Sequence, residues 1–411
     1  MTTSPRVRRI KVKGLFGIFD HEIPLNMAER ITILHGPNGY GKTKILEMVD
    51  ALLDGPLDEL TSVPFESFAV EFEAGGILEV VHTCHSDGLY EGLTDLAGLV
   101  VTYQRSPAMK PEVMEGADLL PKLPFGDLDD LRAKASRQVH EWIGERCGET
   151  RTLSIVTQRL LQEHRPSRFE QQIVPAVLGH SDAVVQLIQV KLAAYAAHAQ
   201  VLDSTFLDRL FQPQQVLSVG EAEVRLQHLE EKRARLIRLG VLEPEREAPR
   251  KLPPLEESKR DVLTVYLDHT ESKLEVLEDL ARRIDLLTAA INRRFAYKRM
   301  SISREDGFVF HSLFDGSIIP LESLSSGEQH ELVLLSTLLF HVSPGVLVLI
   351  DEPEISLHLA WQSEFLDDLL EMVKLGGFDV LVATHSPAII NDRWDLTVEL
   401  KGPELPAKAA E

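Results

Sequence analysis

A glycine-rich run near the N-terminus has the residue types and spacing of a phosphate-binding loop. It fits the pattern GxxxxGK(S/T) and reads Gly36-Pro37-Asn38-Gly39-Tyr40-Gly41-Lys42-Thr43. The glycines let backbone N–H groups surround phosphate oxygens at the start of a helix, Lys42 can reach the outer phosphates, and the Thr43 hydroxyl can bind magnesium. An apolar run, 31–34, precedes the loop, and an amphipathic stretch, 42–53, follows it. We therefore expect a strand, the loop and a helix in that order.

Two carboxylates follow a wholly apolar run in the C-terminal part of the chain. Asp351 and Glu352 come directly after residues 346–350, which have the composition of a buried strand in a parallel sheet. We expect Asp351 to hold magnesium and Glu352 to polarise the water that attacks a phosphoryl group. Taken alone, two surface acids closing a strand would be the simpler interpretation. The glycine-rich run favours the catalytic one.

A third motif precedes the apolar stretch 332–340 and reads Leu324-Ser325-Ser326-Gly327-Glu328-Gln329. The pattern predicts a helix that begins at this motif. Ser325 and the N–H groups around Gly327 would then form a second anion site at the N-terminus of that helix. One molecule does not need two such sites for one nucleotide. An ordinary serine N-cap with Glu328 nearby would give a similar pattern.

Together these motifs resemble the Walker A loop, the signature and the Walker B strand of ABC-type ATPases. The resemblance implies ATP and Mg²⁺ as cofactors, ATP hydrolysis as the activity, and a homodimer as the working form. In that family the signature of one subunit closes over the ATP held by the Walker A loop of the other, so that two ATP molecules are sandwiched. The resemblance assigns this contact to Ser325, Ser326, Gly327 and Glu328.

Further segments extend the resemblance. Residues 354–358 look like the D-loop that crosses the dimer interface, and Thr384-His385-Ser386-Pro387 looks like the switch-histidine segment, which implies that His385 assists Glu352 in catalysis. Gln104 ends the predicted strand 99–104 and matches the Q-loop glutamine, a contact to magnesium and water. A lone glutamine or histidine at such a position would also suit a structural role.

The resemblance is closest to the subgroup that contains RecF, the SMC-like repair ATPases and the OLD-type defence ATPases. The wording Asp-Glu-Pro-Glu-Ile-Ser-Leu-His at 351–358 is typical of the OLD type. OLD proteins continue into a C-terminal nuclease domain, whereas only a short tail follows His385 here. We therefore expect this chain to lack that domain and any nuclease to be a separate polypeptide.

The pattern of elements predicts an α/β fold. We expect an ABC-type ATPase head with a mixed central sheet and an antiparallel β patch, interrupted by a large helical lobe. The expected domains are 1–105 and 298–411 for the two parts of the head, and 106–297 for the lobe. Residues 106–125 are rich in proline and are expected to be irregular, and 127–297 to be mainly helical. The expected strands are 6–13, 21–25, 31–34, 68–72, 77–82, 99–104, 300–302, 308–311, 346–350 and 380–383.

One long helix of the lobe carries a packing seam. Its apolar positions alternate steps of three and four residues, which predicts packing against another helix. We expect a short antiparallel helical pair, with the partner at 226–239 and the turn at 241–254. The seam positions are Leu267, Thr270, Leu274, Leu277, Ala281, Ile284, Thr288, Ile291 and Phe295.

The charge balance argues against nucleic acid as a long-range partner. Of the 411 residues, 43 are basic and 64 acidic, so the formal net charge is −21. DNA remains a candidate partner only through a local basic patch. Such a patch alternates with apolar residues and would equally suit a solvated edge strand; it consists of Arg6, Arg8, Arg9, Lys11 and Lys13.

The remaining composition indicates a cytoplasmic protein. Cys84 and Cys147 form no CxxC pair, so no disulfide framework or zinc spacing is present. The basic N-terminus lacks the apolar run of a signal peptide, and no stretch approaches the roughly 20 apolar residues of a membrane span.

Three functional hypotheses follow. The preferred one is an ATP-hydrolysing dimeric switch in anti-phage defence or DNA maintenance, acting with a separately encoded effector. The second is an ATP-gated scaffold that hydrolyses slowly and holds an effector protein. The third, the ATPase subunit of a membrane transporter, is disfavoured by the long insertion between Gln104 and Leu324.

Overall fold

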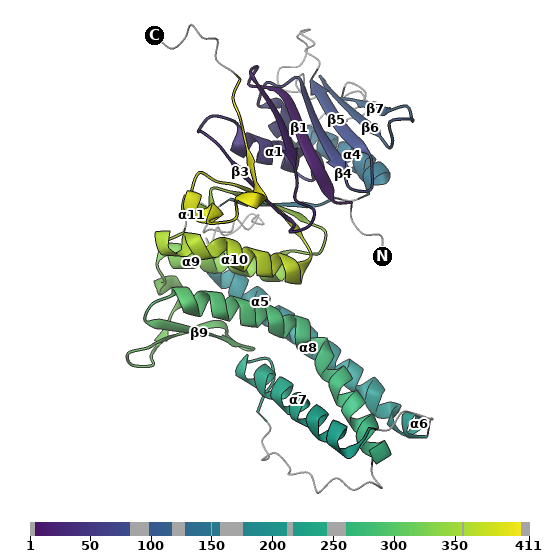
Figure 1. Cartoon of the computed structure of the whole chain (residues 1–411), viewed down its shortest axis with the longest axis vertical. Helices are drawn as coiled ribbons and strands as arrows, with labels where there is room; N and C mark the ends of the chain where they lie inside the picture. The colour runs from purple at the N-terminus through teal and green to yellow at the C-terminus, as the bar shows by residue number, and fades with distance from the viewer. Residues whose placement is uncertain are drawn as a thin grey trace. The chain divides into compact units, whose positions relative to one another are not determined.

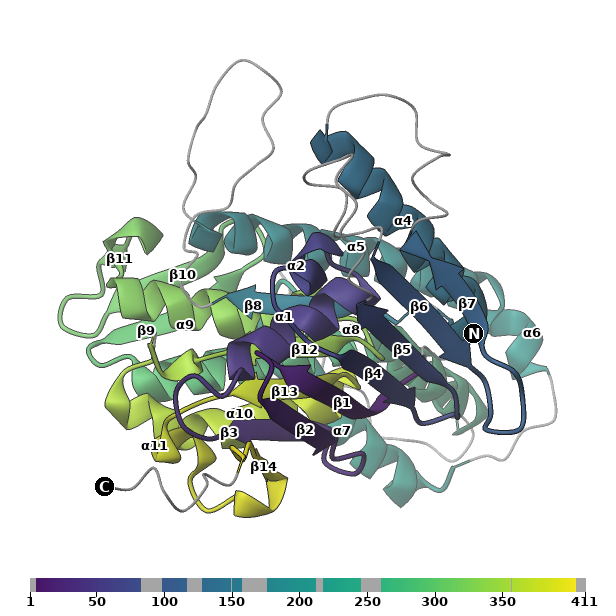
Figure 2. The same cartoon turned by 90° about the horizontal axis from the view of Figure 1, so that it is seen from above.

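The computed structural model divides the chain into two compact units. It describes residues 5–82, 98–116, 128–148, 150–156, 176–211, 217–244, 260–355 and 357–403. The first, which we call the head unit, comprises Met1–Gln158 and His341–Glu411. The second, the helical unit, comprises Arg159–Phe340. Figures 1 and 2 show the elements of both.

An antiparallel sheet of six strands forms one layer of the head unit, in the order β2-β1-β4-β5-β6-β7. Burial alternates along β2, as a sheet with one face on the core requires. The predicted antiparallel patch is confirmed. The expectation of an irregular 106–125 segment is wrong for its middle, because the short strand β7 pairs with β6 there, while 117–127 lie outside the described residues. The strands are β1 Val7–Leu15, β2 Phe19–Pro24, β4 Ser67–Phe72, β5 Ile77–His82, β6 Leu99–Gln104 and β7 Glu112–Glu115.

A five-stranded sheet forms the second layer, in the order β14-β3-β13-β12-β8, and all its neighbours are parallel. Its middle strands β13 and β12 are buried, as their apolar composition predicts. Two strands of this sheet, β8 and β14, were not predicted. Their runs are short and polar residues interrupt them, so they carry little β signal. The strands are β3 Ile31–His35, β8 Thr152–Val156, β12 Leu347–Asp351, β13 Asp379–Ala383 and β14 Thr397–Glu399.

Helix α1 (Lys42–Leu53) is buried on most of its surface, and it contributes to one apolar core together with both sheets. The period of two along the parallel strands decides which residues join that core. Leu347 and Leu349 of β12 belong to it, whereas the intervening Val348 and Ile350, also buried, do not. Helix α4 (Leu128–Cys147) adds to the same core, and α10 (Leu359–Gly376) covers the other face of the parallel sheet (Figure 1).

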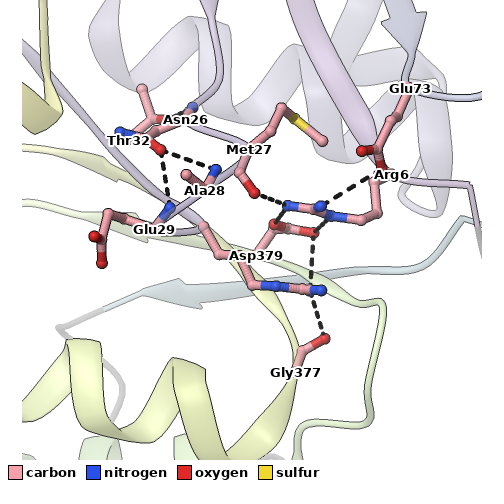
Figure 3. Close-up of polar contacts among 10 residues, drawn as sticks. Arg6, Asn26, Met27, Ala28, Glu29, Thr32, Glu73, Gly377 and Asp379 are labelled. Atoms are coloured by element: carbon pink, nitrogen blue, oxygen red, sulfur yellow. Dashed lines mark hydrogen bonds and ion pairs between the residues drawn. The ribbon is translucent and has the colours of Figure 1, made fainter.

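An ion pair ties the first strand to the parallel sheet. The Arg6 guanidinium donates to both carboxylate oxygens of Asp379, at 2.9 and 2.6 Å, and to the Met27 carbonyl oxygen at 3.0 Å (Figure 3). Arg30 donates to the Gly377 carbonyl oxygen at 2.9 Å and stands 3.8 Å from Asp379. The Asp379 hydrogen bond raises the pKa of Arg6 against the opposing effect of burial. This planar, two-point contact fixes where β1 meets β13.

Four of the five residues of the proposed basic patch are paired with carboxylates, Arg6 with Asp379 and the other three on β1. Arg8 and Lys11 contact Glu71 at 3.0 and 2.7 Å, and Arg9 contacts Glu22 at 2.5 Å. The alternative of an edge strand is also wrong, because β1 lies between β2 and β4. These ion pairs explain the alternation of charge along the strand without nucleic acid.

In its described residues, the helical unit combines four helices with a small sheet and the predicted signature helix. The small sheet is antiparallel and has the strand order β11-β10-β9. Two of its strands, β9 and β10, were predicted. A π-helical turn, Thr337–His341, follows α9. The elements are α5 Ala176–Ser204, α6 Phe206–Leu210, α7 Val219–Arg238, α8 Arg260–Arg294, β9 Lys298–Ser303, β10 Gly307–Ser312, β11 Ile318–Ile319 and α9 Ser326–Ser336. This unit also contains the 3₁₀ turn Leu321–Ser323. The shorter helical segments of the head unit are α2 Asp58–Thr61, α11 Pro387–Ile390 and the 3₁₀ turns Pro353–Ile355 and Trp394–Leu396.

The predicted partner of α8 runs in the wrong direction for an antiparallel pair. Arg225 of α7 contacts Glu271 at 2.5 Å, and Arg235 contacts Glu278 at 2.8 Å, so residue numbers rise together and the helices are parallel. The leucines on both helices predict that the helices pack together but not in which direction. The ion pairs between the helices fix the direction and the register.

The antiparallel partner of α8 is α5 (Figure 1). Ser181, near the start of α5, accepts from the Phe308 N–H in β10, which follows α8 in the chain. Asp203, at the end of α5, contacts Lys273 in the first half of α8. The predicted turn at 241–254 lies mostly outside the described residues.

The compact units divide the chain at other positions than the expected domains. Helix α4 and strand β8, expected in the lobe, belong to the head unit, because Ala135, Val139 and Ile143 pack in its core and β8 pairs with β12. Residues 298–340, expected in the head, belong to the helical unit, where Lys298 and Arg294 contact α9.

The chain thus has a mixed α/β fold with a central parallel sheet and antiparallel patches. Within the described ranges, no helix combines the length and the apolar character that crossing a bilayer requires.

Replacing Arg6 with methionine should destabilise the head unit. The side chains of Arg6 and Asp379 are only 16% and 9% exposed, so the substitution leaves a poorly solvated carboxylate with one distant cation, Arg30. We expect the free energy of unfolding in urea to fall by about 2 kcal/mol. Arg8→Met is the matched control, because the Arg8 side chain is half exposed and should change the value by less than about 1 kcal/mol. Equal losses for the two variants would contradict this role of Arg6.

Candidate nucleotide-binding site

Three neighbouring strands of the parallel sheet end at one edge, and each leads into a predicted site segment. The glycine loop follows β3, Thr384 and His385 follow β13, and Asp351 and Glu352 close β12. Strand β13 pairs with β3 on one side and β12 on the other, so the three segments are adjacent. In open parallel sheets this edge is where ligands bind.

The glycines of the loop adopt a backbone that other residues rarely adopt. Gly39 and Gly41 have φ angles of +83° and +86°. A Cβ atom on Gly41 would lie 2.5 Å from Cδ2 of the fully buried Leu15, whereas a Cβ on Gly39 would meet nothing within 4 Å. Gly41 is therefore required by packing as well as by conformation, and Gly39 leaves open space on the exposed side of the loop.

The N-terminus of α1 is suited to an anion. Its N-cap is Gly41, no side chain caps it, and the first turn contains no acidic residue. The backbone N–H groups at this end therefore have neither a capping oxygen nor a carboxylate to satisfy them. An uncapped helix start beneath a glycine loop is the arrangement that binds phosphate.

Lys42 is held under the loop. Its ammonium group donates to the carbonyl oxygens of Gly36 and Pro37 at 2.8 and 3.1 Å, and it lies 3.3 Å from Nδ1 of His385. Burial lowers the pKa of Lys42, and the nearby carboxylates of Glu352 and Asp351 oppose this shift. Because an ammonium can only donate, His385 Nδ1 is the acceptor, which places the proton of the neutral ring on Nε2.

Thr43 and Asp351 form the part of the site that fits a divalent cation. The Thr43 hydroxyl donates to Asp351 Oδ1 at 3.2 Å, and burial raises the pKa of Asp351. No group of three His, Cys, Asp or Glu side chains in the described ranges could hold a metal unaided. Two such oxygen ligands fit Mg²⁺ that is also bound by phosphate, since Mg²⁺ usually takes only one or two protein carboxylates.

Glu352 and His385 face each other beyond the strand ends. His385 Nε2 is 3.8 Å from Glu352 Oε1. Glu352 has a φ angle of +46°, an uncommon conformation for a residue with a side chain, and its N–H donates to the Ala383 carbonyl oxygen at 2.8 Å. The structure thus brings together Lys42, Thr43, Asp351, Glu352 and His385.

Glu354 positions the histidine segment, a role that sequence reasoning did not give it. Its carboxylate accepts from the Thr384 hydroxyl at 2.8 Å and from the His385 N–H at 2.7 Å. Gln362 supports the next residue, because its Oε1 accepts from the Ser386 hydroxyl at 2.7 Å. Glu354 and Gln362 are far from His385 in the sequence, so no local pattern predicts these contacts. The intervening Ser356 lies outside the described residues.

Two further contacts brace the loop. His21 Nε2 lies 3.1 Å from the Tyr40 carbonyl oxygen, and burial lowers the pKa of His21. Beyond the end of β14, the Leu400 N–H donates to the His35 carbonyl oxygen at 2.9 Å, and a Cβ on Gly36 would come within 2.9 Å of the Leu400 carbonyl oxygen. The expected short tail after His385 therefore supports the loop.

Gln104 has a different partner from the one expected. It is the last residue of β6, and its Nε2 donates to the Met109 carbonyl oxygen at 3.0 Å. A magnesium contact would require the side chain to exchange this partner.

The signature segment forms the N-terminus of α9 in the helical unit. Ser325 is the N-cap and makes a capping box with Glu328, whose carboxylate is also bound by Lys298 at 2.8 and 2.7 Å. Ser325 and Ser326 are exposed. The box uses the N–H of Glu328 and not those of Ser326 and Gly327, and Lys298 offsets the charge that a carboxylate brings to this helix end.

Alanine substitutions at two glycines of the loop should differ in stability. Gly41→Ala combines a positive φ with a clash in the core and should lower the free energy of unfolding by about 2–3 kcal/mol. Gly39→Ala has the same φ but free space and should cost about 1 kcal/mol. Urea unfolding of both variants measures the difference. Equal losses would show that Leu15 can move aside.

Asp351→Asn should stabilise the protein in the absence of nucleotide. Because the pKa of Asp351 is raised above its ordinary value of 3.8, the folded state holds a proton that the unfolded state releases, so stability falls as pH rises through this interval. At pH 7 the variant should melt roughly 1–3 °C higher, after allowance for partial exposure. The gain should disappear below about pH 4.

Asp395→Asn is the control for this measurement. Its hydrogen bond with Arg393 lowers the pKa of Asp395, so this substitution should not stabilise the protein at pH 7. A lower melting temperature for Asp351→Asn would contradict the assigned effect of burial.

Part of the chain matches a known family. Residues 204–391 match the model described as "AAA domain, putative AbiEii toxin, Type IV TA system". The match begins after the glycine loop and includes the signature segment, Asp351, Glu352 and His385. No curated protein matches the sequence.

Solved structures give distant similarities. An Smc head domain with an extended coiled coil, from Pyrococcus furiosus and bound to the C-terminal domain of ScpA, is 12% identical, with a TM-score of 0.33. An SmcHead bound to the C-winged helix domain of ScpA is 11% identical, with a TM-score of 0.37. Each alignment covers 94% of this chain and 91% of the other. By the family match, residues 204–391 are similar to an AAA-type ATPase domain.

Proposed function

We propose that this protein is an ATP-hydrolysing switch in which two copies close around two ATP molecules. The observation that carries the proposal is the convergence of Lys42, Thr43, Asp351, Glu352 and His385 at the edge of one parallel sheet. Phosphate and magnesium ligands stand there beside a carboxylate and an imidazole that can act on water. A structural role would not require these residue types together.

Within one copy, the glycine loop and the start of α1 bind the phosphates. Lys42 exchanges its loop carbonyl oxygens for phosphate oxygens, and Thr43 and Asp351 hold Mg²⁺, which neutralises phosphate charge when bound. Gln104 would join this set by releasing Met109. Glu352 orients and polarises the attacking water, and His385, positioned by Glu354, binds at the outer phosphate.

The second copy completes each site in this proposal. The exposed N-terminus of α9, with Ser325, Ser326, Gly327 and Glu328, covers the nucleotide held by the other copy. Its accessibility supports such a contact, since a helix end buried within its own unit could not reach a neighbour. Pre-organised N–H groups of this kind stabilise phosphate charge.

The biological setting we propose is anti-phage defence or DNA maintenance, together with a separately encoded effector. The matched family is described as a putative toxin of a toxin–antitoxin system, a two-component arrangement that supports a partner protein. The ion pairs along β1 give no support to DNA as the direct ligand.

Glu352→Gln should trap an ATP-bound dimer. The amide keeps the size of the side chain but cannot accept the proton of water, so hydrolysis should fall at least about 100-fold while binding persists. The solution mass of this variant should double on adding ATP and Mg²⁺. Lys42→Ala is the matched control, and it should lose nucleotide affinity in calorimetry and remain a monomer. Wild-type hydrolysis by Glu352→Gln, or an unchanged mass with ATP bound, would refute the proposal.

A further inference from the structure

A cluster of large apolar side chains is exposed at one end of the small sheet in the helical unit. Tyr297 precedes β9, Leu313 and Phe314 follow β10, and Ile318 begins β11. Phe314 is 80% exposed, Ile318 70%, and Tyr297 and Leu313 more than 60%. We call these four residues the sheet-end patch. Isolated exposed apolar residues are ordinary, whereas a contiguous group indicates an interaction surface.

The patch has a defined structure. The rings of Tyr297 and Phe314 stack with centroids 5.4 Å apart and an angle of 22°. Tyr297 has a φ angle of +64°, which is unfavourable for an aromatic residue, and its carbonyl oxygen accepts from the Leu313 N–H at 2.9 Å. Strain that keeps a large ring in solvent indicates a function outside the unit's own core.

The patch is continuous with the signature end of α9. Lys298, next to Tyr297, donates hydrogen bonds to both carboxylate oxygens of Glu328 in the capping box. On the other side, β11 leads through the turn Leu321–Ser323 directly into Ser325. A second copy that binds the N-terminus of α9 would therefore also have a part of its surface next to the sheet-end patch.

The head unit exposes a second, smaller apolar site beside its glycine loop. Phe16 and Ile18, in the turn between β1 and β2, are 38% and 59% exposed, and we call them the turn patch. A Cβ on Gly41 would lie 3.3 Å from a ring atom of Phe16, so this turn touches the loop. Phe16 also has a positive φ, +56°, and its N–H donates to the Pro64 carbonyl oxygen at 2.9 Å.

We propose that the sheet-end patch of one copy docks on the turn patch of a second copy. The inference rests on the proposed function, because a composite site brings the signature of one copy to the glycine loop of the other, and each patch adjoins one of these two elements. A two-fold axis makes the contact twice per dimer. Burying the stacked rings adds apolar stabilisation to a contact that is otherwise polar and charged.

A charge-swap experiment tests this pairing in the Glu352→Gln background. Phe314→Lys places an ammonium group in the sheet-end patch, and Ile18→Glu places a carboxylate in the turn patch. Each alone should weaken the ATP-dependent dimer at least about tenfold in analytical ultracentrifugation, because a charge is desolvated against apolar surface. The double variant should recover most of that loss, because the two charges then face each other across both copies of the contact.

Matched controls place the same charges elsewhere. Val190→Lys on α5 and Val113→Glu on β7 alter residues that are 64% and 52% exposed. They should leave the dimer constant within about twofold. Thermal melts of every variant should agree with the parent, since the altered positions are on the surface.

Two results would overturn the inference. One is a dimer as tight for Phe314→Lys as for the parent, which would leave the patch to another partner. The other is a double variant whose dimer is as weak as expected when the free-energy losses of the two single variants are added. If the parent variant Glu352→Gln binds ATP but does not dimerise, both the proposed function and this inference are wrong.

Discussion

The head unit depends on the alignment of three parallel strands that end at one edge. Because β3, β13 and β12 are neighbours, the loop that carries Lys42 is forced against the residues that close the other two strands. The result is a buried ammonium group next to two carboxylates and an imidazole. Burial disfavours the charges of both Lys42 and Asp351, so the site holds groups that are better satisfied by a ligand than by the protein alone.

The two helix starts differ in a way that suits different tasks. Helix α1 begins at Gly41 without any side-chain cap, which leaves its N–H groups to a ligand. Helix α9 begins with a complete capping box, and Lys298 neutralises its acidic member. Such a prepared, exposed helix end is stable by itself and can meet a charged surface without rearrangement. We therefore propose that the start of α1 binds phosphate and that the start of α9 closes over the nucleotide of the partner copy.

Sequence reasoning predicted the segments with strong local signals and missed those defined by tertiary contacts. The glycine loop, α1, β12 and β13 were predicted because glycine spacing and apolar runs mark them directly. The strands β8 and β14 are short, and only pairing with β12 and β3 makes them strands. The parallel direction of α7 was missed because a leucine seam has no polarity, and the role of Glu354 because its partners lie about thirty residues away. The domain boundaries and the roles of the site residues stay predictions.

Mixing two inactive variants tests the composite site most directly. Lys42→Ala removes the phosphate-binding lysine, and Ser325→Arg blocks the helix end that would cover the partner's nucleotide. If each site combines one loop with the other copy's α9, random mixing makes half of the dimers mixed, and each mixed dimer contains one intact site. Because Lys42→Ala alone stays monomeric, mixed dimers can exceed that share, and ATP hydrolysis should return to between about a quarter and about a half of the wild-type rate for independent sites. A mixture no more active than the two variants measured separately would contradict the account.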